Sequence, residues 1–459
     1  MFDKKIKSII SLTVLICMLF SLGCAEVPNR SDPVVPSDSD SIAFDTEEDV
    51  LTDTSDVSSD TKEPSDPSAD TSDSSVEADP PQKPADKKVS FLCAGDNIVY
   101  NGQIKEAKTY ATDDPSYEYD FCYMYTDIAD IIASYDVSFV NQETVMAGKS
   151  FGYSAYPEFN TPQDLGRNLA EIGFDVINIA SNHMLDMREQ GLRNTINFLR
   201  QQDVLMVGGY DNEDDFYDIR IIERNGVKIA VVGFTYGTNG GNEANSLMIP
   251  YIYQKNYYRY GANEQLVDSE KITRWIKKAK EEADVVVVSM HWGEEYTQKP
   301  SSEQKRLAKI ICDNGADIII GHHTHTLQPI EWIKSDNGNK TLCLYSLGNL
   351  VSQTDEVISL AGGLATFDII FNEVDGVRIE NISFIPLVTD YRNSFKNTKI
   401  YLLENYTEQL CQTHGIVVRF EKLVSMKILA YYVKNVIKKE YLPDSYLEFY
   451  ENLISPSSE

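Results

Sequence analysis

From residue 89 onward, continuous apolar runs alternate with segments of helical periodicity. The apolar runs, each interpreted as a buried strand, cover residues 89–96, 136–143, 174–180, 204–208, 283–290 and 317–321. The helical segments between them cover residues 161–173, 188–201, 268–282 and 302–314. Strands that are apolar on both faces and are separated by helices predict an α/β fold whose sheet is covered by helices.

The second half of the chain adds hairpins to this alternation. Asn225-Gly226, a strong turn signal, separates apolar runs at 219–223 and 227–234. Further paired runs, each interrupted by a Gly-containing turn, lie at 328–333 with 341–345 and at 364–371 with 377–388. We therefore expect antiparallel pairs beside the parallel strands, followed by helices from about residue 399 onward.

Several of the predicted strands end in a side chain that could bind a metal or take part in catalysis. These strand ends carry Asp96, Glu143, Asn182, His183, His291, His323 and His325. The chain has six histidines, and all except His414 follow such strands. A single histidine is more often structural, but five at strand ends indicate one shared site, because sites in open α/β sheets form outside the carboxyl ends of strands.

The types of side chain at these positions indicate which metals would bind. Oxygen donors mixed with imidazoles, without thiolates, suit Zn, Mn or Fe. A carboxylate that can bridge, such as Glu143, would suit two divalent ions. His323 and His325 would present their rings on one side of an extended segment, because side chains alternate along a strand.

The first residues have the pattern of a bacterial export signal. Lys4, Lys5 and Lys7 precede an apolar run over residues 9–22, which ends at Gly23-Cys24. A small residue directly before Cys24 resembles the lipobox, so we expect residues 1–24 to be a lipoprotein signal peptide and Cys24 to be lipidated. The alternatives are an uncleaved anchor helix and ordinary secretion. The mature protein is expected outside the cytoplasm, anchored to the membrane by lipid.

Residues 25–87 are predicted to form a disordered acidic linker rich in Ser, Thr and Pro. Within residues 31–80 there are 16 acidic residues and one lysine, a net charge of 1 − 16 = -15. This segment thus holds half of the chain's total of -30. The acidic balance excludes nucleic acid as the main partner, because phosphate binding needs a basic face.

Six short motifs occur in order between residues 88 and 388. They are Gly95-Asp96, Asn141-Gln142-Glu143, Ser181-Asn182-His183-Met184-Leu185-Asp186, His291-Trp292-Gly293-Glu294-Glu295-Tyr296, Gly321-His322-His323-Thr324-His325 and Ser346-Leu347-Gly348-Asn349. Together they resemble the CapA family of capsule and poly-γ-glutamate biosynthesis proteins, related to calcineurin-like metallophosphoesterases. The resemblance implies a four-layer sandwich of two mixed β-sheets flanked by helices over residues 88–390. A helical C-terminal extension would occupy residues 391–459.

The resemblance also implies roles for individual residues. His183 would be a general acid or contact the scissile group, and Asp186 would orient it. Asn141, Glu295, His322 and Asn349 would support the ligands or contact the substrate, although Asn349 could equally be a turn residue. The residues that look like ligands of two metal ions are Asp96, Glu143, Asn182, His291, His323 and His325.

These expectations lead to a functional hypothesis with two alternatives. The leading hypothesis is a metal-dependent hydrolase or transferase that acts on an anionic cell-surface polymer such as poly-γ-glutamate, in contact with subunits of a membrane polymer synthase. The first alternative is a non-catalytic accessory or export subunit of such a synthase. The second is a surface metallophosphodiesterase or nucleotidase.

Overall fold

A computed structural model of the chain describes residues 84–111, 117–239, 249–253 and 267–455. The predicted signal peptide, Cys24 and the linker up to residue 83 lie outside these residues. The chain divides into two units, Met1–Ala78 and Asp79–Glu459, and the second contains everything described below. Among its described helices, none has both the length and the apolar character that a membrane span requires.

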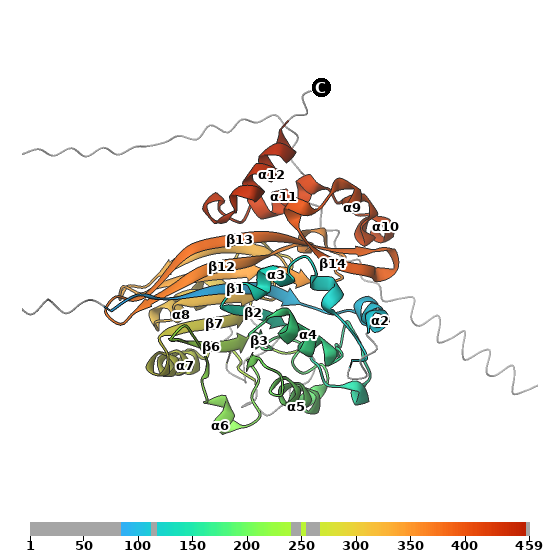
Figure 1. Cartoon of the computed structure of the whole chain (residues 1–459). Helices are drawn as coiled ribbons and strands as arrows, with labels where there is room; N and C mark the ends of the chain where they lie inside the picture. The colour runs from blue at the N-terminus through green and yellow to red at the C-terminus, as the bar shows by residue number, and fades with distance from the viewer. Residues whose placement is uncertain (1–83, 112–116, 240–248, 254–266, 456–459) are drawn as a thin grey trace, which may run out of the picture. The chain divides into compact units, whose positions relative to one another are not determined.

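The larger of two sheets has eight strands and mixed pairing. Its order is β14-β13-β12-β1-β2-β3-β4, with β11 paired to the end of β1. Strand β1 runs parallel to β2 and β11 but antiparallel to β12, so it joins a parallel half to an antiparallel half (Figure 1). The strands are β1 (Lys87–Asn97), β2 (Val137–Gln142), β3 (Val176–Asn178), β4 (Leu205–Val207), β11 (Asn349–Val351), β12 (Ala361–Asn372), β13 (Gly376–Arg392) and β14 (Lys396–Leu402).

The smaller sheet has six strands in the order β5-β6-β7-β8-β10-β9. Its four inner strands are parallel, whereas β5 and β9 are antiparallel edges that close the predicted hairpins. The strands are β5 (Arg220–Arg224), β6 (Val227–Thr235), β7 (Val285–His291), β8 (Ile318–His322), β9 (Leu327–Lys334) and β10 (Lys340–Leu347).

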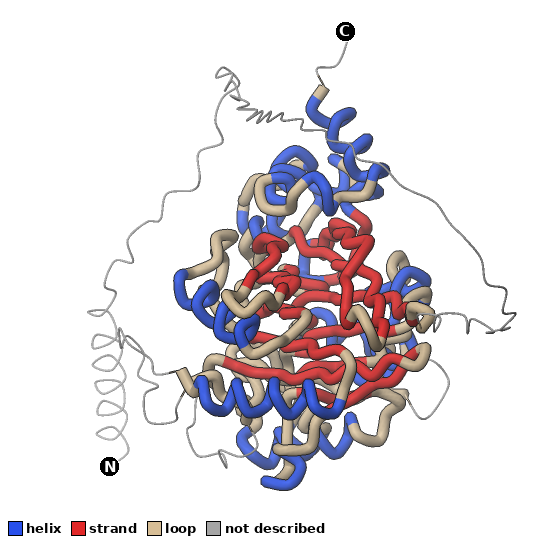
Figure 2. Tube along the Cα trace, turned by 90° about the vertical axis from the view of Figure 1, so that its left-hand side faces the viewer, coloured by secondary structure: helices blue, strands red, loops and turns tan. Residues whose placement is uncertain are grey.

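The side chains of β1 show how the two sheets become one core. Phe91 and Cys93 belong to the same apolar cluster as Ile229 and Val287 of the smaller sheet. Leu92, which points to the opposite face because side chains alternate, belongs to a second cluster formed with helices. The sheets therefore pack face to face, with helices on both outer faces, and the predicted four-layer α/β sandwich is confirmed (Figure 2).

The predicted helical segments 188–201, 268–282 and 302–314 are helices to within two residues of those bounds, and the segment 161–173 is a helix only from Asp164 to Ile172. Three further outer helices were not predicted. Ser301 Oγ accepts a hydrogen bond from Gln304 N, and the Gln304 side chain accepts one from Ser301 N, which starts α8. Gly173 ends α4 with a φ of 110°, a conformation that glycine adopts without strain. The helices outside the larger sheet are α2 (Asn101–Tyr110), α3 (Ala129–Ala133), α4 (Asp164–Ile172) and α5 (Arg188–Leu199). Those outside the smaller sheet are α6 (Glu213–Phe216), α7 (Ser269–Glu282) and α8 (Ser302–Asp313).

The C-terminal part differs from the prediction of helices throughout residues 391–459. Strand β13 continues to Arg392, and β14 pairs with it, so the larger sheet extends to Leu402. Helices follow only after that strand: α9 (Glu408–Thr413), α10 (Gly415–Phe420), α11 (Met426–Lys434) and α12 (Asp444–Ile454). They lie over β13 (Figure 1), and their buried Leu429 and Tyr446 belong to the same cluster as Phe384 of that strand. The smaller sheet packs on the larger sheet as far as β12. The C-terminal helices bury the apolar face of the next strand, β13.

The five cysteines of the described part are free thiols, and all except Cys122 are buried. Burial raises the pKa of the Cys93 and Cys343 thiols well above the usual range. These side chains therefore act as small apolar core residues.

Candidate metal centre

The strand ends of both sheets meet at one buried cluster. Asp96 lies at the end of β1, Glu143 follows β2, His291 ends β7, and His323 and His325 follow β8. A close backbone contact helps to bring the two sheets together: a Cβ atom on Gly95 would lie 2.0 Å from the backbone O of Gly348, so only glycine fits there. The predicted convergence of strand-end residues is therefore present in the structure.

Asp96 is held by hydrogen bonds from several elements. Asn141 Nδ2 donates to Asp96 Oδ1 at 2.8 Å, and the backbone N–H of His323 donates to Oδ2 at 3.1 Å. Asn141 in turn accepts from Asn178 Nδ2 at 2.7 Å, which fixes its amide. Burial acts to raise the pKa of Asp96, but the hydrogen bond and charge of His325 outweigh it, so the pKa lies below its ordinary value. Asp96 is therefore a fixed carboxylate that favours its charged form.

Glu143 lies at the centre of the cluster. Its Oε1 lies 3.8 Å from His291 Nε2, 3.8 Å from His325 Nε2 and 4.0 Å from His183 Nε2. Both carboxyl oxygens are buried, and no hydrogen-bond partner for them occurs among the described residues. Burial raises the pKa of Glu143 well above the usual range, with the Asp96 charge adding to the effect. Buried carboxyl oxygens without hydrogen-bond partners are costly, so a cation that binds both of them would stabilise the site.

The turn directly after β8 carries two of the candidate ligands, His323 and His325, on strained backbone. His323 has a φ of 89° and His325 a φ of 55°, whereas non-glycine residues rarely adopt positive φ. The prediction of an extended segment is therefore wrong, because the backbone bends at both residues. The rings nevertheless stay close, with centroids 6.0 Å apart. Backbone strain at two candidate ligands separated by one residue is typical of a functional site.

The three imidazoles have different electrostatic surroundings. Burial lowers the pKa of His323 to about 3 and that of His322 to about 4. Burial also acts to lower the pKa of His325, but the Glu143 and Asp96 carboxylates outweigh it and raise the pKa to about 9. Carboxylates and imidazoles that are buried together, with so little water around them, form a suitable binding site for a divalent cation.

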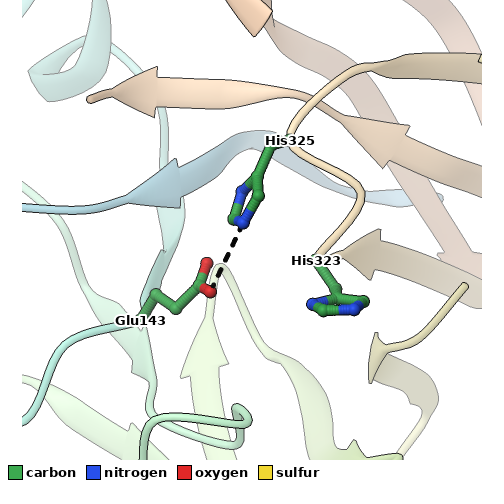
Figure 3. A group of neighbouring side chains, drawn as sticks. All are labelled: Glu143, His323 and His325. Atoms are coloured by element: carbon green, nitrogen blue, oxygen red, sulfur yellow. Dashed lines mark ion pairs between the residues drawn. The ribbon is translucent and has the colours of Figure 1, made fainter. Parts of the chain in front are cut away.

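Two overlapping sets of side chains fit a metal ion. Glu143, His323 and His325 form one set, and Asp96, Glu143 and His291 form the other, with ligand atoms within 4.8 Å of one another in each. Figure 3 shows Glu143 and His325 pointing toward one another, with the ring of His323 beside them. His291 Nδ1 and His323 Nδ1 are, like the Glu143 oxygens, buried without partners among the described residues. The donor set and its unmet polar atoms therefore fit divalent metal.

His183 and Asp186 form a pair beside these sets. His183 Nδ1 lies 2.7 Å from Asp186 Oδ2, and the same oxygen accepts from Phe159 N at 2.7 Å. The Phe159 ring contacts the His183 ring edge-on at a centroid distance of 4.8 Å. The imidazole is thus fixed on two sides, and its Nε2 is the ring nitrogen nearer Glu143.

The remaining predicted residues take several positions. Asn182 Oδ1 lies 2.9 Å from His291 Nε2, and Asn349 Oδ1 lies 3.1 Å from His325 Nδ1. Asn349 is therefore more than a turn residue, since it also belongs to β11 opposite Asp96. His322 is fully buried, stacks on Phe139, and has Nδ1 3.6 Å from Asp96 Oδ1. Glu295 is exposed and lines the cavity above the cluster.

A cavity of about 790 Å³ opens over the cluster, and Glu143, Asn182, His183 and His325 are among its lining residues. Two further lining residues, Tyr236 and Asn239, were missed by the sequence analysis. The Tyr236 ring lies 4.5 Å from that of His323, and Asn239 Nδ2 lies 3.5 Å from His183 Nε2. Tyr236 directly follows β6 and Asn239 lies four residues beyond its end, so the same rule about strand ends could have found them.

Residues 90–354 match the model of the bacterial capsule synthesis protein family, PGA_cap. The chain belongs to this family. The resemblance indicated by the six motifs is thereby confirmed, since they all lie within the matched residues.

Two curated members of the CapA type are similar to part of the chain. The PGA biosynthesis protein CapA of Bacillus subtilis is 38% identical over 184 residues, 40% of this chain and 44% of that protein. The capsule biosynthesis protein CapA of Bacillus anthracis is 37% identical over 185 residues, 39% of this chain and 41% of that protein. The matched stretch spans less than half the length of either relative.

Among solved structures, the NAD nucleotidase of Haemophilus influenzae is similar at a TM-score of 0.35 and 12% identity. The match covers 80% of this chain and 60% of that one. At this level the similarity says nothing about activity.

Proposed function

We propose that the chain is an extracytoplasmic, membrane-tethered protein of capsule or poly-γ-glutamate metabolism that acts as a metal-dependent hydrolase or transferase on a cell-surface polymer. The observation that carries this proposal is the pair of buried ligand sets that share Glu143, beside the fixed His183. The polymer context is supported by membership in the capsule synthesis family.

Six residues would together bind two divalent ions of Mn, Zn or Fe: Asp96, Glu143, Asn182, His291, His323 and His325. Such ions supply Lewis-acid polarisation of a scissile amide or phosphoester and lower the pKa of water. Asn141 and Asn349 would keep Asp96 and His325 in place, because each makes a direct hydrogen bond to its ligand.

Proton transfer to the leaving group is assigned to His183. The Asp186 carboxylate at 2.7 Å from Nδ1 fixes the orientation of the ring, so Nε2 is the ring nitrogen that would donate the proton. His183 lines the cavity, so the leaving group of a bound polymer can reach it. This step alone would contribute about 10²–10⁴ in rate.

Purified full-length protein tests the catalytic proposal. We expect stoichiometric divalent metal and turnover of an amide polymer or of a model phosphodiester, with turnover lost in His183→Ala protein. A protein without stoichiometric metal, whose His183→Ala variant still maintains surface polymer in cells, would instead be a non-catalytic accessory or export subunit. Turnover of the phosphodiester alone would make it a surface metallophosphodiesterase.

The tether is a separate part of the proposal and needs its own test. Its support is the basic start, the apolar run over residues 9–22 and Cys24. We expect Cys24→Ser to move the protein out of the membrane fraction of cells. Unchanged membrane association of that variant would contradict a lipid anchor at Cys24.

A further inference from the structure

The mouth of the cavity is formed by aromatic side chains from two parts of the chain. Tyr156 and Tyr296 come from the family-matched region, and Phe395 and Phe420 come from the segment after it. Tyr156 is 73% exposed, Tyr296 44% and Phe420 36%, although large aromatic rings are usually buried. Exposed aromatic rings that surround the entrance to one cavity indicate a surface on which a ligand stacks.

The aromatic wall from the C-terminal segment is held rigidly against the candidate metal centre. Gln353 Nε2 donates to Phe395 O and to Thr398 Oγ1, both at 2.9 Å. The Glu106 carboxylate accepts from the backbone N–H groups of Asn397 and Thr398 at 2.7 and 3.2 Å. The position of Phe395 is thus set by the core of the protein, so the mouth is formed before a ligand binds.

The charges around the cavity do not favour a chain with many negative groups. Among the described lining residues there is no lysine or arginine, whereas Glu295 and Asp355 supply carboxylates outside the candidate metal centre. Lys422, the partner of Asp355 and Glu356, is engaged in ion pairs. The guanidinium of Arg419 lies over the Phe395 ring, 4.6 Å from its centroid. Away from the metal ions proposed for the centre, carboxylates of a ligand would be repelled by those of Glu295 and Asp355.

We propose that the cavity binds an uncharged glycan segment of the polymer. The aromatic faces would stack on sugar rings, and carboxylate and amide oxygens such as those of Glu295 and Asn101 would accept hydrogen bonds from hydroxyl groups. The inference rests on the proposed function for the reaction that the protein performs. What it adds is the chemical class of the ligand. It departs from the expectation of poly-γ-glutamate, in which every residue carries a carboxylate. The repeat units inside the cavity would carry hydroxyls instead of charges, and only the scissile group would carry charge.

Calorimetric titration of full-length protein in detergent, with its metal ions retained, tests the inference by binding alone. The probes are hexamers of glucose and of N-acetylglucosamine, together with hexa-γ-glutamate as the polyanion. We expect at least one hexasaccharide to bind more tightly than hexa-γ-glutamate. Tyr296→Ala and Phe420→Ala should each weaken that binding about tenfold, since each removes one stacking face. The matched control is Phe151→Ala, because Phe151 is 39% exposed and does not line the cavity.

The outcomes separate this inference from the proposed function. Three outcomes would each overturn the inference. The protein could bind neither hexasaccharide, or the Tyr296 and Phe420 variants could bind as tightly as the unchanged protein. The third is salt-sensitive binding of hexa-γ-glutamate that is tighter than binding of either hexasaccharide. Hexasaccharide binding that depends on Tyr296 and Phe420 supports it, even if the metal-loaded protein has no turnover. In that last case only the catalytic proposal fails.

Discussion

The candidate metal centre and the aromatic mouth belong to one cavity but are built in different ways. The centre consists of strand ends, where Asp96, Glu143 and His291 are fixed by the hydrogen bonding of two central sheets. The mouth takes Phe395 and Phe420 from a segment that follows the family-matched residues. Under the two proposals, the chemistry depends on where parallel strands end, and recognition of the ligand depends on a local segment that follows the family-matched residues.

The largest expected effect comes from removing the shared carboxylate. Glu143→Gln should abolish stoichiometric metal binding and reduce turnover by about 10³ or more, because both ligand sets contain Glu143. Metal analysis and thermal unfolding would measure it: added metal should raise the melting temperature of the unchanged protein but not of the variant. Glu294→Gln, which changes an exposed neighbour of the cavity residue Glu295, is the control. Retained metal in the Glu143 variant would contradict the assignment.

His183→Ala should lower turnover by about 10²–10⁴ while leaving bound metal unchanged. The reason is that His183 is paired with Asp186 and belongs to neither ligand set. Asp186→Asn should act in the same direction but less strongly, since the ring stays in place while its orientation is less fixed. Loss of metal from His183→Ala protein would instead make this histidine a ligand.

Metal uptake should release protons and weaken as the pH falls. The two carboxylates that raise the pKa of His325 to about 9 keep its ring protonated at neutral pH in the metal-free protein. A metal must displace that proton, so affinity should rise up to about tenfold per pH unit between about pH 7 and 9 and level off above. Titration calorimetry in buffers of different ionisation enthalpy counts the protons. If the heat of metal binding is the same in buffers of different ionisation enthalpy, no proton is released and His325 is not a ligand.

The smallest expected effect concerns the mouth. Gln353→Ala removes the two hydrogen bonds that hold Phe395 and Thr398, so the aromatic wall should loosen. We expect a several-fold higher KM for the polymer with kcat and metal content nearly unchanged, because uniform binding is lost while the reacting groups are intact. Steady-state kinetics separates the two parameters. A fall in kcat equal to the rise in KM would mean that mouth and centre are coupled.

Much of the centre could be predicted from the sequence because its signal is local. Each candidate ligand follows an apolar run, and the topology of parallel strands brings such ends together. The bend at His323 and His325 could not be predicted, since positive φ at non-glycine residues depends on the surrounding structure. Strand β14 was missed for a related reason: residues 396–402 are half polar and become a strand only by pairing with β13. The aromatic mouth depends on contacts between segments far apart in the chain, and composition does not reveal these.

The pairing of β1 has a consequence for how the protein folds during its synthesis. Lys87 of β1 is paired with Phe371 of β12, so the first strand of this unit needs one of the last before its sheet can close. Synthesis from the N-terminus therefore delivers Asp96 long before it delivers the neighbours that complete its surroundings. Such long-range pairing makes folding slow and leaves an unpaired strand exposed in incomplete chains. A chain truncated before β12 would have all six candidate ligands yet no closed sheet to hold them.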